Sequence, residues 1–455
     1  MSATAHLHNC LLSPTNESVT GATRHSKKAI ANKKYNKELG MKRTALLALG
    51  LGFCLAAEAA DPITLGLNYP RTGSYKEEGL SQMRGALLAV DEINAKGGVL
   101  GRPLKLSTRN SASRPEKAVA NVDKLADEGA AMLFGGASSA VAIAAGKRAR
   151  ERGLLYFGTL TYSNDTTGKD AQRYMFRECN NAWMSARVLG QYLNEHLPNK
   201  RYFYVTSDYT WGHTSESSLR QATGTQDTQK HPGIRTAFPG ARLSDYRDAL
   251  TKVADSDTEV LVLVLFGDDL VRAMRIANDL GLTRRMQVAV PNLTLSMVEA
   301  AGPDIMYGVL GTEPWTWRVP ELEGSEAGRQ FVRNYDERYQ THPSSSAASA
   351  YSIVYQWSDA VTRAHSLDSE RVIAALEGHR YNLLKDEQQW RSFDHQNIQT
   401  VYAVKVKPRE EVLKDRFKQD YFEIVHRLSG EQAAAPSIAE WQTERRASGQ
   451  ALALQ

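Results

Sequence analysis

The stretch DEINAKGGVLGRPLKL, Asp91–Leu106, joins a predicted helix to a predicted strand through a glycine-rich turn. Residues 79–95 carry apolar side chains on one helical face, which predicts an amphipathic helix. Gly97 and Gly98 stop this helix, because glycine readily adopts the left-handed conformation that ends helices. The alternating segment 104–108 starts the next strand. The stretch is therefore the exit of a strand–helix–strand unit.

The same unit recurs along most of the 455 residues, in two series that meet after Arg177. Strands that alternate with helices imply parallel sheets, so each series predicts a doubly wound α/β lobe. Ser113 and Glu116 have the spacing of a capping box for the helix that runs through Leu125. We expect strands at residues 63–68, 104–108, 131–136, 154–158, 202–206, near 236, 259–267, 287–290 and 400–406. We expect further helices at residues 138–152, 183–195, after 212, 269–280, 325–340 and 346–364.

Residues 41–60 have the form of a secretory signal peptide. Lys42 and Arg43 make its positive start, residues 44–55 are apolar, and Ala57–Ala59 is an A-x-A processing site. The apolar run is shorter than the ~20 residues that a membrane-spanning helix needs. The sequence therefore predicts export, with a soluble mature chain in the periplasm.

Residues 1–40 are polar, rich in lysine and without periodicity, so we expect a disordered upstream extension. Residues 1–60 contain eight lysines and arginines against three acids, and they account for the whole formal net charge of +5. The rest of the chain is close to neutral, which gives no electrostatic argument for nucleic-acid binding. Cys179 is the only cysteine that follows this region, so no intrachain disulfide is expected in the mature chain.

Polar side chains follow two strands of the first series, where a doubly wound sheet binds its ligands. Ser138 and Ser139 lie in GGASSA at a predicted helix N-terminus, whose free N–H groups suit a carboxylate or another polar ligand group. The alternative is that one serine only caps the helix. Thr159, Thr161 and Tyr162 follow the next strand and favour the ligand interpretation.

The second series offers four more candidates for ligand binding. Tyr209 and Trp211, in SDYTWGHTS, follow a strand and are predicted to wall the pocket from the opposite lobe, unless Trp211 packs in the core. Asn292 ends a further strand and can hydrogen-bond a ligand. Glu313 lies where the chain should cross between lobes, and it either meets a ligand amine or stabilises a hinge.

Motifs of the common enzyme classes are missing from the sequence. It contains no G-x-S-x-G, G-x-x-x-x-G-K-[ST], H-E-x-x-H or G-x-G-x-x-G pattern. The eleven histidines are scattered and have no metal-ligand spacing. We therefore predict no catalytic residue, no cofactor and no metal site.

The segment GALLAVDEINAKGGVLGRPLKL, residues 85–106, resembles the start of the periplasmic substrate-binding proteins of branched-chain amino acid ABC importers, the leucine/isoleucine/valine-binding family. The resemblance covers residues 63–406. Further segments occur in the order that this family has them: NYPRTGSYKEEG, LFGGASSAVAIA, YMFRECN, SDYTWG, ANDLGL and FDHQNIQTVYAVKV.

The resemblance implies the type I periplasmic binding fold, in which two Rossmann-like lobes joined by three crossover strands close on a ligand. Lobe 1 is then predicted to comprise residues 61–177 and 315–387, and lobe 2 to comprise residues 178–314 and 388–406. Residues 407–455 are charged and then rich in Ala, Ser and Gln, and we expect a surface extension with a loose end.

By position, the resemblance implies that the serines of GGASSA hold a ligand carboxylate, that residues 159–162 form the partner turn, and that Tyr209 and Trp211 form the wall of the second lobe. Members that bind amino acids usually carry an acidic residue where this chain has Asn292. An ordinary branched-chain amino acid is therefore not the expected ligand, whereas amides, urea, aromatic acids and other small organic molecules stay open.

We predict a monomeric receptor that captures a small polar organic ligand, an amino acid, amide or related acid, between its lobes. It delivers this ligand to the membrane permease of an ABC importer and binds no nucleic acid. One alternative is a periplasmic sensory receptor that presents its ligand to a signalling partner. A remote alternative is an α/β hydrolase, against which the missing nucleophile elbow argues.

Overall fold

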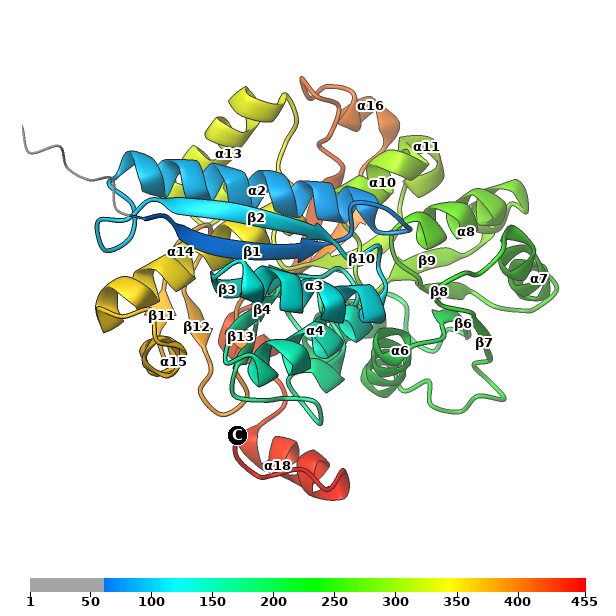
Figure 1. Ribbon diagram of the computed structural model, residues 1–455. Helices are drawn as coiled ribbons and strands as arrows, with labels where there is room; N and C mark the ends of the chain where they lie inside the picture. Colours follow the sequence, from blue (N-terminus) through cyan, green and yellow to red (C-terminus); the bar gives the residue numbers. More distant parts are fainter. Residues whose placement is uncertain (1–60) are drawn as a thin grey trace, which may run out of the picture. The chain divides into compact units, whose positions relative to one another are not determined.

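The computed structural model describes residues 61–455, so the predicted extension (1–40) and signal peptide (41–60) lie outside the described residues. Within the described part, five parallel strands form the sheet of lobe 1, in the order β2-β1-β3-β4-β5 (Figure 1). They are β1 (Ile63–Tyr69), β2 (Leu104–Asn110), β3 (Ala130–Gly135), β4 (Tyr156–Gly158) and β5 (Met175–Arg177).

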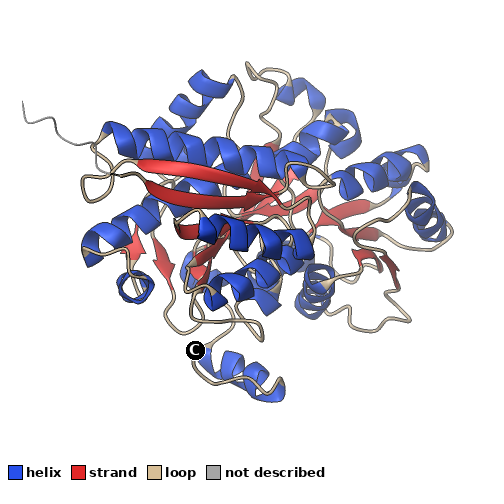
Figure 2. Cartoon of the chain, in the orientation of Figure 1, coloured by secondary structure: helices blue, strands red, loops and turns tan. Residues whose placement is uncertain are grey.

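Helices cover both faces of the lobe 1 sheet (Figure 2). On one face, α3 and α4 pack over Leu133, Tyr156 and Met175. The opposite face receives Met132 and Phe134 and is covered by α2 and α14. Alternate residues of β3 thus enter different layers, as in a strand buried on both faces. The helices are α2 (Lys76–Ala95), α3 (Pro115–Asp127), α4 (Ser139–Glu151), α12 (Val319–Leu322), α13 (Glu326–Tyr339), α14 (Ser345–Ala364) and α15 (Ser369–Leu376).

The glycine stop after α2 forms as predicted, whereas the capping box of α3 does not. Gly98 has a φ of 75°, and its N–H donates to the carbonyl of Ile93 at 3.0 Å. At α3 the N-cap is Arg114, and no side chain caps the helix. Pro115 occupies the first helical position, so the helix starts one residue later than a box from Ser113 would need.

Within residues 61–455, seven strands form the sheet of lobe 2, in the order β15-β14-β10-β9-β8-β6-β7. β14 runs antiparallel to both β10 and β15, and the other neighbours are parallel. β8 is buried along its whole length, as predicted for a central strand. The strands are β6 (Tyr202–Ser207), β7 (Gly233–Thr236), β8 (Val260–Val264), β9 (Gln287–Val290), β10 (Leu310–Glu313), β14 (Val401–Val406) and β15 (Phe422–Leu428).

Helices also accompany the strands of lobe 2, and α8 shows why they form. It buries an apolar stripe, including Leu270, Ala273, Met274 and Ala277, against the sheet side. The helices of this lobe are α5 (Ala182–His196), α6 (Thr210–Thr223), α7 (Leu243–Ala254), α8 (Asp268–Asp279), α9 (Leu282–Arg285), α10 (Leu295–Ala301), α11 (Pro303–Met306) and α16 (Arg409–Val412). The predicted α/β architecture of two doubly wound lobes is confirmed.

The chain crosses between the lobes after β5, after β10 and before β14. A small antiparallel sheet precedes the last crossing, made of β11 (Arg380–Tyr381), β12 (Gln388–Trp390) and β13 (Asn397–Ile398). Gln396 bridges to Arg177 of β5, which ties this sheet to lobe 1. The strands from residue 388 to residue 398 therefore accompany lobe 1, and the predicted assignment of residues 388–406 to lobe 2 fits only the part from about residue 399.

The C-terminal segment differs from the loose surface extension that the sequence suggests. β15 pairs with β14 along its length and so completes the lobe 2 sheet. The chain then returns to lobe 1 through α17 (Gly430–Ala433) and α18 (Ile438–Ala447). Trp441 Nε1 donates to the carbonyl of Thr167 at 2.7 Å. β15 is buried only at its two ends, and its middle carries a His and an Arg, so the sequence does not mark it as an edge strand.

Candidate functional site

Loops at the carboxyl ends of the two sheets contact each other. From lobe 1, Tyr75 stacks on Phe238 with ring centroids 5.5 Å apart and meets Phe266 edge-on at 5.2 Å. The hydroxyl of Tyr75 lies 3.3 Å from that of Tyr209. Burial, followed by the neighbouring Tyr209, raises the pKa of Tyr75 well above its usual value. Both hydroxyls are therefore neutral groups able to donate and accept hydrogen bonds.

Gly267 lets the two lobes approach closely. It has a φ of 60°, and a Cβ added there would lie 2.4 Å from the carbonyl oxygen of Ser74 in lobe 1. The same carbonyl accepts a hydrogen bond of 3.0 Å from the backbone N–H of Asp268, the first residue of α8. Glycine at residue 267 thus permits a backbone contact that any side chain would obstruct.

The serines of GGASSA occupy different environments. Ser138 is the N-cap of α4 and is 1% exposed, yet its side chain caps no backbone N–H. Within residues 61–455 its Oγ has no hydrogen-bond partner of normal geometry. It lies near the hydroxyl of Tyr209, whose pKa is raised by burial and is lowered in part by the hydroxyls of Tyr75 and Ser138. Ser139 Oγ accepts a hydrogen bond of 3.0 Å from the N–H of Ser163. Of the two predicted serines, Ser138 is the one with an unused hydroxyl.

The second predicted turn is held by hydrogen bonds to its neighbours within lobe 1. Thr159 Oγ1 donates to the carbonyl of Gly136 at 2.5 Å, which joins this turn to GGASSA. Thr161 Oγ1 lies 2.7 Å from Thr166 Oγ1, and Thr161 N–H donates to Cys179 Sγ at 3.2 Å. Both threonine hydroxyls have protein partners and shape the turn.

Arg177 fixes the loop that presents Tyr162. Its guanidinium is fully buried and donates to the carbonyls of Thr161, at 3.0 Å, and Ser163. Burial lowers the pKa of Arg177 to about 10. Tyr162 is 3% exposed, and its ring centroid lies 6.1 Å from that of Phe266 in lobe 2.

Trp211 meets the same Phe266 ring from the side of lobe 2, at 5.9 Å between centroids. Its Nε1 donates to Asn292 Oδ1 at 3.1 Å, and Asn292 Nδ2 donates to Ser185 Oγ at 3.2 Å. Asn292 is 1% exposed and its amide already has protein partners at both ends. We expected this amide to hydrogen-bond a ligand, whereas in the structure it orients Trp211.

Two carboxylates are buried near the hinge. Glu78 of α2 accepts hydrogen bonds from Thr294 Oγ1 at 2.6 Å and from the hydroxyls of Ser296 and Ser346. Within residues 61–455, neither carboxylate oxygen of Glu313 has a hydrogen-bond partner. Burial, with a contribution from Glu78, raises the pKa of Glu313 well above its usual value. The nearby hydroxyl of Ser345 and ammonium of Lys385 oppose this rise in pKa, but Glu313 forms no ion pair within residues 61–455.

A line of polar contacts, which we call the seam, joins the lobes along another edge. Ser163 Oγ lies 2.8 Å from Thr210 Oγ1, and Asn164 Nδ2 donates to Ser218 Oγ at 3.0 Å. Asp165 accepts a hydrogen bond from Thr210 Oγ1. Each pair links the η1 turn (Asn164–Thr166) of lobe 1 to α6 of lobe 2. The seam therefore holds the lobes in a closed arrangement.

The closed arrangement brings some of the predicted site residues to one interface. A crevice between the lobes, beside Tyr75 and Glu78, has a volume of only about 10 Å³. This is room for about one water molecule. Asn292 lies behind Trp211, and Glu313 lies at the hinge end. Among the predicted residues, Ser138, Tyr162 and Tyr209 make contacts across this interface, and Trp211 packs on Phe266 beside it. The contacts of Ser139, Thr159 and Thr161 lie within lobe 1.

Several residues of this interface were not predicted from the sequence. Phe266 lies near the end of the segment EVLVLVLFG, two residues after β8 ends at Val264, so the rule that strand ends carry the site could have identified it. Tyr75 lies in NYPRTGSYKEEG and follows the first strand in the same way. Glu78 is one of several acidic residues that the sequence offers for the cleft, but the sequence does not show that it faces inward, because its hydroxyl partners lie more than 200 residues away.

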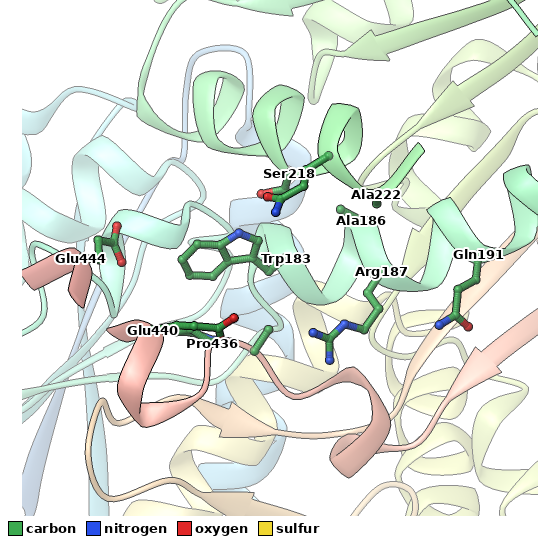
Figure 3. Close-up of a pocket in the computed structure, with 11 residues that line it drawn as sticks. Trp183, Ala186, Arg187, Gln191, Ser218, Ala222, Pro436, Glu440 and Glu444 are labelled. Atoms are coloured by element: carbon green, nitrogen blue, oxygen red, sulfur yellow. The ribbon is translucent and has the colours of Figure 1, made fainter. Parts of the chain in front are cut away.

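A cavity of about 560 Å³ lies beyond the seam, between α5, α6 and the C-terminal segment (Figure 3). None of the nine predicted site residues lines this space, which we call the seam cavity. Among residues 61–455, no group of three or more His, Cys, Asp or Glu side chains is arranged to hold a metal ion. In the same part of the chain, no helix combines the length and the apolar character needed to cross a bilayer.

The sequence matches the family model described as periplasmic binding protein over residues 62–411. The leucine-, isoleucine-, valine-, threonine- and alanine-binding protein of Pseudomonas aeruginosa is 23% identical over 333 residues, which cover 72% of this chain and 86% of the relative. The Leu/Ile/Val-binding protein BraC3 of Rhizobium johnstonii is 32% identical over 169 residues, but these span 37% of this chain and only 45% of the relative.

The fold has a close counterpart among solved structures. The crystal structure of a periplasmic binding protein from Burkholderia mallei superposes with a TM-score of 0.75 at 25% identity, covering 83% of this chain and 97% of that chain. The family match spans both lobes and all three crossings, and the superposed structure has the same architecture. The chain therefore belongs to the periplasmic binding protein family.

Proposed function

We propose that this chain is an extracytoplasmic, periplasmic solute-binding protein that captures a small polar organic ligand between its lobes and delivers it to the permease of an ABC importer. The observation that carries the proposal is the meeting of hydroxyls and aromatic rings from both lobes at one buried interface. Tyr75 and Tyr162 come from lobe 1, and Tyr209 and Trp211 come from lobe 2.

The polar end of the ligand is assigned to the GGASSA turn. Ser138 Oγ is buried and unpartnered among the described residues, and it lies at the N-terminus of the 13-residue helix α4. A helix start favours negative charge and offers free N–H groups. A carboxylate or amide oxygen of the ligand would satisfy both. The ligand's apolar body then packs between Tyr162 and Trp211.

Donor groups of the ligand are assigned to the buried carboxylates instead of residue 292. Glu313 has two carboxylate oxygens without partners in the described chain, and Glu78 lies close enough to raise its pKa. An amine placed there would stabilise the ionised form of the carboxyl group, and an amide N–H would supply a missing hydrogen bond. This supports amino acids, amides and related acids as the ligand class.

Capture is proposed to work by closure. The ligand first meets the hydroxyl and helix end of lobe 1, and the lobes then close about the three crossings. Closure adds the rings of lobe 2 and excludes water. The relatives named above are binding proteins, and this mechanism needs no covalent step.

A thermal-shift screen against amino acids, amides, ureas and aromatic acids tests the proposal. A true ligand at a hundred times its dissociation constant should stabilise the chain by roughly 2.7 kcal/mol. Small-angle scattering should then show a smaller radius of gyration in the presence of the ligand. A ligand that stabilises the chain without changing its dimensions, in a protein whose ligand-free form is open, would contradict capture by closure.

A further inference from the structure

The seam cavity has the size of a small-molecule site. Its volume of about 560 Å³ falls within the range of roughly 300–1,000 Å³ that ligand pockets occupy. Its walls come from α5, α6 and residues 435–444 of the C-terminal segment, as Figure 3 shows. This segment is anchored on lobe 1, because Arg445 Nη1 donates to the carbonyls of Gly168 and Ala171 at 2.9 and 3.1 Å.

The apolar residues of the seam cavity surround the half-buried indole of Trp183. The indole of Trp183 stands in the middle of the cavity in Figure 3, with Pro436 beneath it. Ala186 and Ala222 complete the apolar lining from the two helices. Trp183 is only half-buried, so the closed arrangement leaves an indole partly uncovered by the protein. Aromatic faces attract organic cations as well as apolar groups.

Two carboxylates of α18 flank this indole, Glu440 and Glu444, which are one helical turn apart. Glu440 accepts a hydrogen bond of 2.8 Å from the backbone N–H of Ser437. Glu444 Oε2 is buried and has no hydrogen-bond partner among residues 61–455. Burial, followed by the nearby Asp165, raises the pKa of Glu444. Both carboxylates line the cavity, so a hydrogen-bond donor or a positive charge placed in it would be favoured.

The positive side chains around the cavity are already engaged elsewhere. Arg187 Nη1 donates to the carbonyls of Gln432 and Ala434 at 3.1 and 2.9 Å. Lys169 Nζ lies 2.6 Å from Asp165 Oδ2. Arg445 directs its guanidinium to backbone carbonyls. None of these cations forms an ion pair with Glu444 in the described structure.

We propose that the seam cavity is a second ligand site, which binds a small organic amine in its protonated form. The ammonium group lies between Glu440 and Glu444 and receives a cation–π contribution from Trp183, while the apolar body of the amine covers Ala186 and Pro436. The site is separate from the interface that holds the predicted ligand residues, because the Ser163–Thr210 and Asn164–Ser218 contacts of the seam lie between them.

Isothermal titration of the full chain with benzylamine tests this assignment, with benzyl alcohol and benzoate as probes of the same shape. Benzylamine is expected to bind with a dissociation constant of about 1 mM or lower, and both other probes at least about tenfold more weakly. Equal binding of benzyl alcohol or benzoate, or no benzylamine binding at about 10 mM, overturns the proposal.

Matched variants locate the site. The double variant Glu440→Gln, Glu444→Gln should weaken benzylamine binding at least about tenfold, whereas Glu431→Gln on the exposed α17 should leave it unchanged. Ser138→Ala should also leave it unchanged, because Ser138 belongs to the interface between the lobes. Unchanged binding in the double variant overturns the proposal, and a loss in Ser138→Ala places benzylamine at the other site.

A spectroscopic measurement covers the case in which the double variant folds poorly. Indole N–H resonances of the wild-type chain report each tryptophan, and the resonance missing in Trp183→Leu identifies Trp183. Benzylamine is expected to shift this resonance more than those of the buried Trp211 and Trp441. A largest shift at Trp211 instead assigns the amine to the interface between the lobes and overturns the second site.

Discussion

Ser138 and Ser139 are neighbours in the sequence, but only one of them has an unused hydroxyl. Ser139 Oγ receives the N–H of Ser163 at 3.0 Å, whereas Ser138 Oγ has no partner among the described residues. A buried polar group without a partner costs free energy unless a bound molecule supplies one. Ser138 is therefore the candidate ligand contact, whereas Ser139 shapes the turn.

Replacing Ser138 tests this separation. We predict that Ser138→Ala weakens binding of the ligand found by the thermal-shift screen about tenfold, because a charge-assisted hydrogen bond is lost. The free energy of unfolding without ligand should change by less than about 0.5 kcal/mol. Titration calorimetry and urea denaturation measure the two quantities. Ser217→Ala, on the exposed face of α6, is the control, and wild-type affinity in Ser138→Ala would refute the assignment.

Glu313 gives a prediction of pH dependence. Its pKa is raised in the folded chain, so the folded chain keeps a proton that the unfolded chain releases. Stability should therefore fall as pH rises above about 4.3, the ordinary value for glutamate, by up to about 1.4 kcal/mol per pH unit. Glu313→Gln removes this contribution and should be more stable than wild type at pH 7.5, but nearly equal at pH 4. Urea denaturation at both values measures the difference.

The exposed Glu410→Gln serves as the matched control for this measurement, since it removes a carboxylate from the surface helix α16. It should show the same pH dependence as wild type. If Glu313→Gln and wild type lost stability in parallel between pH 4 and 7.5, Glu313 would be solvated or paired in solution.

At the scale of elements, one ammonium group joins the crossing segments. Lys385 Nζ donates to the carbonyls of Pro314, at 2.5 Å, and Thr400, at 2.8 Å, and to Gln399 Oε1 at 2.7 Å. Gln399 Nε2 in turn donates to the carbonyl of Glu178. Pro314, Gln399 and Glu178 each belong to a different crossing. Lys385 therefore fixes the register of all three segments with respect to one another.

Removing this ammonium should destabilise the hinge. Lys385→Met leaves buried carbonyls without donors, and we expect a loss of at least about 2 kcal/mol in the free energy of unfolding. Denaturant titration followed by tryptophan fluorescence measures the loss. Lys414→Met, at an exposed position, should have little effect. A loss below about 0.5 kcal/mol for Lys385→Met would mean that water or a neighbour replaces the ammonium.

Elements with a strong local pattern were predictable, and those that depend on a distant partner were not. The apolar run that forms β8 indicates a central strand without further information. β15 has a mixed pattern, and it becomes a strand because β14 offers an unpaired edge beside it. The same dependence on partners explains why residues 388–398 follow lobe 1 and not lobe 2.

For the whole molecule, the sequence indicates which turns carry the candidate site but not how closely they meet. Ser138, Tyr162 and Trp211 follow strand ends, which the alternating pattern places at the same edge of each sheet. The contact of Tyr75 with Phe266 joins residues far apart in the chain and depends on the angle between the lobes. No local pattern encodes that angle, because it results from packing at three crossings together.

The return of the C-terminal segment to lobe 1 leads to a prediction about the whole chain. Trp441 is 1% exposed and donates to Thr167, and Arg445 donates to Gly168 and Ala171. We predict that the double variant Trp441→Ala, Arg445→Ala releases residues 437–455, because burial of a large side chain worth about 3–5 kcal/mol is lost locally. Limited proteolysis should then cut this segment rapidly.

The half-exposed Ile438 lies on the same helix and provides the control for this experiment, as Ile438→Ala should remain as resistant to protease as wild type. Equal resistance of the double variant would show that β15 and α17 hold the segment without α18. Proteolysis within lobe 1 instead of the tail would show that α18 is required for the stability of the whole lobe.

This return path has a mechanical consequence. The described chain enters lobe 1 with Ile63 in β1, and Gln455 accepts a hydrogen bond of 3.2 Å from the N–H of Arg173, also in lobe 1. Both attachment points are thus on lobe 1. Lobe 2 does not lie between them. If tension were applied through these two points, as in optical tweezers, α18 would detach from lobe 1 first. The hinge between the lobes would carry no force until α18 had detached.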